Sequence, residues 1–171
     1  KWLYISVCVY NAAWFFCFIN FLDCKMMDFP ILSSLILLPS IGALFLFFTK
    51  SNKENNITVK YVALFTSLVN FFLSIYLWIL FDPSTSEFQF VEDRTWIKEL
   101  INYKVGIDGI SILFIILTTF ITPLCIISVN NSIKNRLREF LIAILIMESF
   151  MIGVFCSLDL VVFYLFFEAG L

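Results

Sequence analysis

Two glutamates lie within segments that are otherwise apolar enough for the interior of a membrane. Glu148 is in the apolar run 140–158, and Glu168 is in the run 160–171. A carboxylate charge in hydrocarbon is costly unless a partner or water accompanies it, so ionisable residues at such positions typically mark proton or ion pathways. We therefore predict that Glu168 and Glu148 translocate protons. The alternative for each is a neutral acid that hydrogen-bonds a backbone carbonyl between helices.

The expected depth of the two glutamates supports a relay. At 1.5 Å per residue, Glu148 is about nine residues, or roughly 13 Å, into the helix expected to start at Phe140, and Glu168 is about equally far past Asp159 from the opposite face. Both side chains are then expected near the membrane midplane. No lysine occurs inside the expected spans, so a cationic partner for Glu168 must come from outside this sequence.

A few neutral polar residues also lie inside the expected spans, and two interpretations are open for them. They either line a wet path for protons or, as is commoner, hydrogen-bond their own helix. These residues are Asn70, Thr118, Thr119 and Thr122.

Composition determines the fold class. Hydrophobic residues make up 61% of the chain and charged residues 14%, against about 45–50% and about 25% in soluble domains. We predict an all-α integral membrane protein. There is no histidine, and the five cysteines form no Cys-x-x-Cys pair, so the usual ligand sets for haem, zinc and iron–sulfur clusters are missing. The chain is expected to bind no metal or cofactor and to have no redox site.

Read at about 20 residues per crossing, the sequence predicts a polytopic bundle of five full spans and the first half of a sixth. The sixth span begins at Leu160 and covers about 18 Å up to Leu171, too short for a hydrocarbon core of about 30 Å. We expect a second chain, or a segment absent from this sequence, to continue the helix after Leu171. The five full spans are Trp2–Leu22, Ile31–Phe48, Tyr61–Phe81, Ile110–Val129 and Phe140–Leu158.

Two regions differ from the spans. Residues 1–25 are expected to form an amino-terminal extension with an extra transmembrane helix, the alternative being a surface or re-entrant segment. The loop 82–108 is the one long aqueous region, and residues 87–91 alternate polar and apolar types, as in a strand. Residues 92–95 look like a turn, so a short surface hairpin is predicted there. Its aromatic residues are either interfacial anchors or a protein contact.

Charges alternate between the two sides of the predicted membrane. One side has seven basic and two acidic residues, and the other has four basic and nine acidic residues. Basic residues favour the matrix or cytoplasmic side. The loops 50–60 and 130–139 are therefore predicted to face the matrix or cytoplasmic side.

Several runs, in order along residues 26–171, resemble one family. These runs are 81–92, Gly106-Ile-Asp-Gly-Ile-Ser111, Leu117-Thr-Thr-Phe-Ile-Thr-Pro123, Arg138-Glu-Phe140, Leu158-Asp-Leu160 and Phe163-Tyr-Leu-Phe-Phe-Glu168. With them, the chain looks like the amino-terminal part of the antiporter-like subunits of respiratory complex I, in particular the mitochondrial-type chain 4 family of NADH-ubiquinone oxidoreductases.

The resemblance implies a proton-pumping domain over residues 26–171 in the mitochondrial inner membrane. The chain would be a subunit of H⁺-translocating NADH:ubiquinone reductase, with flavin and iron–sulfur clusters in partner subunits. Glu168 matches the family's pumping glutamate, whose lysine partner lies two helices further on. Its implied partners are other membrane-arm subunits and membrane lipids, with no nucleic acid. Two alternatives are a subunit of a multisubunit sodium/proton antiporter and a non-catalytic membrane scaffold.

Overall fold

The computed structural model of the chain describes four stretches: residues 30–49, 56–97, 101–129 and 136–171. By its contacts the chain divides into two units, with the boundary between Ile31 and Leu32. The described helices and strands lie in the second unit, apart from Ile31 at the boundary. The predicted span Trp2–Leu22, and with it the extension 1–25, lies outside the described residues.

The described part is mostly helical, as predicted. Four helices, α2 to α5, are long and apolar enough to cross a membrane, and α6 is shorter. The helical class is thus confirmed, and these four helices could span a membrane by their length and composition, while the number of crossings stays a prediction. The helices are α2 (Ile31–Phe48), α3 (Asn56–Leu80), α4 (Ser111–Ser128), α5 (Leu137–Cys156) and α6 (Leu160–Gly170).

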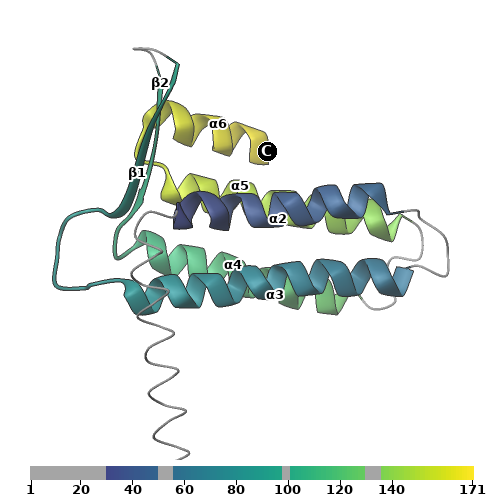
Figure 1. The fold of residues 1–171 in the computed structure, drawn as a ribbon. Helices are drawn as coiled ribbons and strands as arrows, with labels where there is room; N and C mark the ends of the chain where they lie inside the picture. Colours follow the sequence, from purple (N-terminus) through teal and green to yellow (C-terminus); the bar gives the residue numbers. More distant parts are fainter. Residues whose placement is uncertain (1–29, 50–55, 98–100, 130–135) are drawn as a thin grey trace, which may run out of the picture. The chain divides into compact units, whose positions relative to one another are not determined.

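The helices pack around α5. Helix α3 contacts α4 and α5, and α5 also contacts α4 and α6 (Figure 1). Side chains from four helices share one buried cluster, while aromatic residues such as Phe45, Phe65 and Phe72 are exposed. Helices that are apolar on every side are typical of a membrane environment. The buried cluster consists of Ala43, Leu46, Val59, Ala63, Ile126, Leu137, Leu141 and Leu145.

Two glycines permit close approaches between helices. A Cβ atom at Gly42 of α2 would lie 2.4 Å from Thr66 Cγ2 on α3. A Cβ atom at Gly153 of α5 would lie 2.7 Å from the Phe166 ring on α6. Small residues of this kind let membrane helices pack closely, since van der Waals contact is the main force between them.

The predicted hairpin is confirmed between α3 and α4. Strands β1 (Gln89–Ile97) and β2 (Ile101–Ile107) pair antiparallel, with Asp93 opposite Lys104. The register shifts after Gln89, where Phe90 has a φ of 53°. Such a bulge bends the strand and increases its twist.

The predicted position of the turn is wrong. Residues 92–95 are part of β1, and the strands reverse direction between Ile97 and Ile101. The charged residues that suggested a turn are accommodated on the strand. Asp93 is exposed, and the Glu92 carboxylate accepts hydrogen bonds from the first turn of α2. A polar run therefore indicated exposure and capping and not a change of chain direction.

The hairpin binds two helix starts. Glu92 Oε1 accepts from Leu32 N at 2.8 Å, and Glu92 also hydrogen-bonds the Ser33 backbone and hydroxyl. These bonds satisfy amide groups that a helix leaves open in its first turn. On the other strand, Leu158 N donates to Lys104 O at 3.0 Å just before α6 begins.

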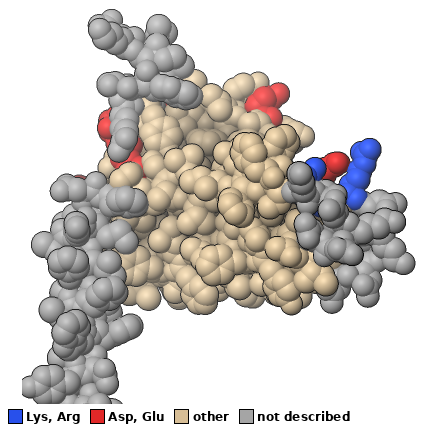
Figure 2. All heavy atoms as spheres, turned by 45° about the vertical axis from the view of Figure 1, so that its right-hand side comes forward, with Lys and Arg blue, Asp and Glu red and all other residues tan. Residues whose placement is uncertain are grey.

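Basic residues gather at the end of the helices opposite the hairpin. Arg138 Nη1 donates to Thr49 O at 2.7 Å, so the start of α5 lies beside the end of α2. Lys60 Nζ donates to Ile127 O at 3.3 Å, which joins the start of α3 to the end of α4. In Figure 2 the blue side chains lie at one end, and the broad surface beside them is tan. This is the charge distribution of a membrane helix bundle.

Candidate functional site

Glu148 is a buried carboxylate in the interior of the helix bundle. Its side chain is 2% exposed, and Glu148 Oε1 accepts a hydrogen bond from Asn70 Nδ2 at 2.8 Å. Asn70 on α3 is fully buried. A buried carboxyl group needs such a partner, because an unpaired polar group in an apolar interior is costly. The structure therefore brings together one predicted site residue and one polar residue of the expected spans.

The face of α3 that carries Asn70 is polar along three successive positions. Ser67, Asn70 and Ser74 are fully buried, and their spacing of three and four residues places them on one side of a helix. Ser74 Oγ lies 2.8 Å from Thr119 Oγ1 on α4. We call Ser67, Asn70, Ser74, Thr119 and Glu148 the polar seam. It lies between α3, α4 and α5.

The structure distinguishes between the polar residues for which the sequence left two interpretations open. Thr118 and Thr122 hydrogen-bond backbone carbonyls of their own helix, the commoner of the two expected outcomes. Thr119 does so as well but also contacts Ser74. Ser67 and Ser74 were missed as candidates. The signal that identifies them is their helical spacing from Asn70.

A second tie anchors α5 beside Glu148. Ser149 Oγ donates to Ile36 O on α2 at 2.5 Å and accepts from Ser40 Oγ at 2.8 Å. Ser149 is 1% exposed. Consecutive residues of α5 thus bond two different helices, which fixes the rotation of α5 about its axis and the direction of the Glu148 side chain.

Glu168 lies in a different environment from the one predicted. It was expected to be buried, but its side chain on α6 is exposed and has no hydrogen bond to another described residue. The reason is the packing of α6, which contacts α5 and β2 and leaves its other faces uncovered. Its environment within the described residues thus differs sharply from that of Glu148.

The two glutamates lie at matching positions along α5 and α6, while their depth in a membrane stays a prediction. Glu148 lies eight residues before the end of α5 at Cys156, and Glu168 lies eight residues after the start of α6 at Leu160. The two carboxylates are therefore each about 12 Å along their helices from the connection between α5 and α6. That connection is capped by Asp159, whose Oδ1 accepts from Val161 N at 2.7 Å.

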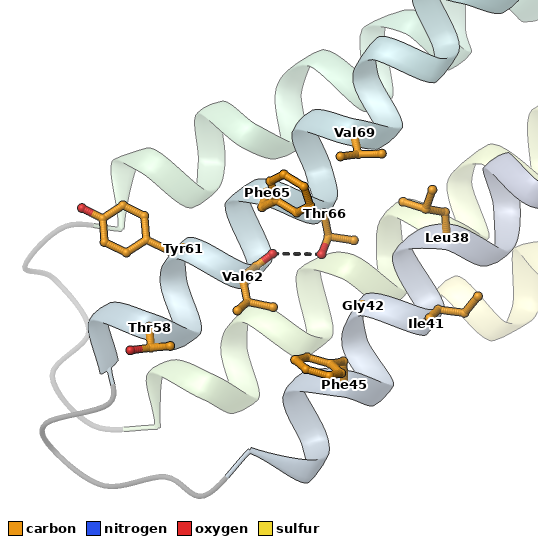
Figure 3. A pocket seen from close by; sticks show the side chains of 10 residues that line it. All are labelled: Leu38, Ile41, Gly42, Phe45, Thr58, Tyr61, Val62, Phe65, Thr66 and Val69. Atoms are coloured by element: carbon orange, nitrogen blue, oxygen red, sulfur yellow. Dashed lines mark hydrogen bonds between the residues drawn. The ribbon is translucent and has the colours of Figure 1, made fainter.

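An apolar groove lies between α2 and α3. It has a volume of about 660 Å³, and Figure 3 shows Leu38, Ile41 and Phe45 of α2 on one side of it. No acidic or basic side chain lines it. The hydroxyl of Thr66 donates to Val62 O of its own helix. This apolar groove is unsuited to proton transfer, and the candidate site is the polar seam.

Among the described residues, no group of three His, Cys, Asp or Glu side chains could hold a metal ion. Cys125 and Cys156 are free thiols, the first exposed and the second buried. The polar seam instead offers hydroxyl, amide and carboxyl groups. The carboxyl group can exchange a proton, hydroxyl groups can relay one, and the amide can hydrogen-bond both.

Comparison with known proteins identifies the family. Residues 31–154 match the family model described as NADH-ubiquinone oxidoreductase chain 4, amino terminus. NADH-ubiquinone oxidoreductase chain 4 of Marchantia polymorpha is 46% identical over 141 residues, covering 82% of this chain and 28% of the relative. The chain 4 protein of Arabidopsis thaliana gives the same identity and coverage.

Bacterial relatives match the same region. NADH-quinone oxidoreductase subunit M of Rickettsia typhi is 46% identical over 149 residues, covering 84% of this chain and 30% of the relative. The chain thus spans less than a third of the length of these relatives. The matching family model covers well over half of this chain, including α2, α3, α4 and Glu148. The chain therefore belongs to the NADH-ubiquinone oxidoreductase chain 4 family and corresponds to its amino-terminal part.

Proposed function

We propose that this chain is part of a proton-translocating membrane-arm subunit of respiratory complex I. On this proposal it is a multi-pass protein of the mitochondrial inner membrane and works with other membrane-arm subunits. Flavin and iron–sulfur clusters belong to partner subunits, and this chain contributes no redox site. The family match supports the assignment, and the apolar helices fit it.

The observation that carries the proposal is the buried pair of Glu148 and Asn70 inside an otherwise apolar bundle. A carboxyl group held among apolar helices changes its charge only when its surroundings change, because the charged form loses hydration there. Glu148 can therefore bind or release a proton in response to a shift of α3 or α5. This is the behaviour that a coupled proton pump needs.

Glu168 is the other proposed proton carrier. By the resemblance of the run Phe163-Tyr-Leu-Phe-Phe-Glu168, we take Glu168 as the counterpart of the family's pumping glutamate. Its exposed side of α6 leaves room for a cationic partner from a later part of the subunit. Glu148 and Glu168 lie at equal distances along their helices from the connection between α5 and α6, and this supports the proposal that a proton passes from one to the other.

The proposed orientation places the basic end on the matrix side. Among the described residues, this end has Lys60, Arg136 and Arg138. On this proposal the loops 50–60 and 130–139 face the matrix. The loop 82–108, which has six acidic and three basic residues, then faces the intermembrane side. The positive-inside rule supports this direction.

Affinity purification of the chain from detergent-solubilised membranes tests the assignment. The proposal predicts that the chain copurifies with a complex that oxidises NADH and shows flavin absorbance and iron–sulfur resonances. A complex without these centres would instead indicate the sodium/proton antiporter alternative. Recovery of this chain without any NADH-oxidising activity would refute the proposal. A mock purification from untagged membranes is the control.

A further inference from the structure

The contact between Asn70 and Glu148 leaves two complementary atoms unused. Asn70 Nδ2 donates to Glu148 Oε1 at 2.8 Å, while the buried Asn70 Oδ1 and Glu148 Oε2 have no hydrogen-bond partner among the described residues. If Glu148 is ionised, both free atoms are acceptors and cannot bond each other. If Glu148 is protonated, its O–H is a donor and the amide oxygen is an acceptor. One proton therefore provides the donor that these two atoms lack.

We propose that Asn70 is the positioning residue of Glu148 and that the two side chains form a reciprocal acid–amide pair when Glu148 is protonated. In this pair, the amide N–H of Asn70 donates to Oε1, and the protonated Oε2 donates back to Oδ1. Loss of the proton breaks the second bond and turns an amide oxygen toward a carboxylate oxygen. Proton release from Glu148 is then coupled to a rotation of Asn70 or to the entry of water.

The neighbours of the pair do not offer another solution for these atoms. Ser74 Oγ is engaged with Thr119 Oγ1 and also donates to Phe71 O. Ser67 Oγ donates to Leu64 O of its own helix. Ser149, the residue next to Glu148, bonds α2 and not α3.

No cation in the described bundle offsets a charge on Glu148. Among the described residues, Glu148 is the one buried residue with an ionisable acid or base other than a thiol. The charged groups of the elements packed against α5 lie elsewhere: Lys60 at the basic end of α3, Lys104 exposed on β2 and Glu168 exposed on α6. Helix α4 contributes none. The surroundings therefore suit the neutral acid and its reciprocal pair.

Infrared difference spectroscopy of the assembled complex tests the pair. The carboxylic acid C=O band that disappears in Glu148→Gln belongs to Glu148. We expect that band at neutral pH in the wild type, and we expect it to shift to higher wavenumber in Asn70→Leu, because Oε1 loses its hydrogen bond. Ser67→Ala is the matched control. It alters a buried seam residue one turn away and should leave the band in place.

Exchanging the two partners provides a second test that does not depend on Asn70→Leu being stable. Asn70→Asp together with Glu148→Gln puts the acid on α3 and the amide on α5. The double variant should recover a hydrogen-bonded acid band and wild-type amounts of assembled complex, whereas Asn70→Asp alone places two acids together and should reduce assembly. An absent Glu148 band in the wild type, or a double variant no better than Asn70→Asp, would overturn the pair.

The link from this pair to pumping rests on the function proposed above, but the pair itself does not. If the band shifts and the exchange restores assembly, the pair is established whatever the pumping result. Unchanged proton translocation in Asn70→Leu would then contradict only the role proposed for Glu148 in pumping. Reduced translocation that the double variant partly restores would support both.

Discussion

The two glutamates of this chain lie at matching positions along neighbouring helices but in opposite surroundings. Glu148 is enclosed by α3, α4 and α5 and bonded to Asn70, whereas Glu168 is on a face of α6 that no other described element covers. A carboxylate with its partner in place is held in one geometry. The exposed carboxylate of Glu168 is accessible to a partner from another part of the subunit. The comparison suggests that Glu148 on α5 pairs within the bundle, whereas Glu168 on α6 pairs with a residue from another part of the subunit.

A change in the contact between α5 and α6 should have the largest effect, because this contact holds the helix that carries Glu168 against the helix that carries Glu148. Gly153→Leu places a side chain where a single Cβ would already lie 2.7 Å from the Phe166 ring. Overpacking typically costs about 1–3 kcal/mol and sometimes more. We expect a marked loss of assembled complex on native gels. Gly109→Leu is the control, because a Cβ at Gly109 meets nothing within 4 Å, and equal losses in both would show that α6 does not depend on this contact.

The enclosed side is tested next through Ser149. Ser149→Ala removes the bonds to Ile36 O and Ser40 that fix α5 against α2. At about 0.5–1.5 kcal/mol for each hydrogen bond, and a further cost for the unpaired carbonyl, the midpoint of thermal inactivation should fall by a few degrees. Ser67→Ala should be milder, since Ser67 bonds only the backbone of its own helix in the described contacts. A larger effect at Ser67 would contradict this ranking.

Loss of the cap at the start of α6 should destabilise this helix by an intermediate amount. Asp159→Ala removes the side-chain cap from Val161 N and Val162 N. Loss of such a cap costs about 0.5–2 kcal/mol, which should appear as faster proteolysis near α6 in solubilised complex. Asp82→Ala is the control, because Asp82 bonds Ser84 N in a loop and caps no helix. Equal proteolysis in the two variants would mean that the cap does not hold α6.

The smallest effect is expected at the start of α4. The Ser111 amide donates to Asp108 Oδ1 at 2.7 Å and lowers the pKa of Asp108 below its usual value. A lowered pKa in the folded state adds stability above the unfolded value of about 3.9, and that stability is lost as the pH falls toward the folded pKa. Asp108→Asn keeps an acceptor but cannot titrate. The thermal midpoint of this variant should therefore fall less than that of the wild type between about pH 5 and pH 3.5.

The helical class and the positions of the helices along the chain were predictable from the sequence, but their lateral partners were not. The apolar runs predicted four of the described helices to within a few residues, and residue counts predicted matching positions of Glu148 and Glu168 along α5 and α6. Which face of each helix is covered depends on packing against other elements. For that reason the exposure of Glu168, the pairing of Asn70 with Glu148 and the use of Glu92 as a cap for α2 appeared only in the structure.

Turn prediction failed for a related reason. Residues 92–95 combine acidic, basic and hydroxyl side chains, a pattern that favours turns on local grounds. In the structure β1 pairs through this stretch with β2, with Asp93 opposite Lys104, and one of its carboxylates binds a helix start about 60 residues away in sequence. Long-range bonds of this kind outweigh local preference, and a single sequence does not display them.

The central claim is that these carboxylates translocate protons, and the ratio of protons pumped to electrons transferred tests it most directly. The ratio should be measured in sealed vesicles containing the assembled enzyme, for the wild type, Glu168→Gln and Glu148→Gln. An amide keeps the size and hydrogen bonding of the side chain but cannot exchange a proton. We predict that Glu168→Gln abolishes or strongly lowers the ratio and that Glu148→Gln lowers it less. An unchanged ratio in Glu168→Gln, with normal assembly, would contradict the account.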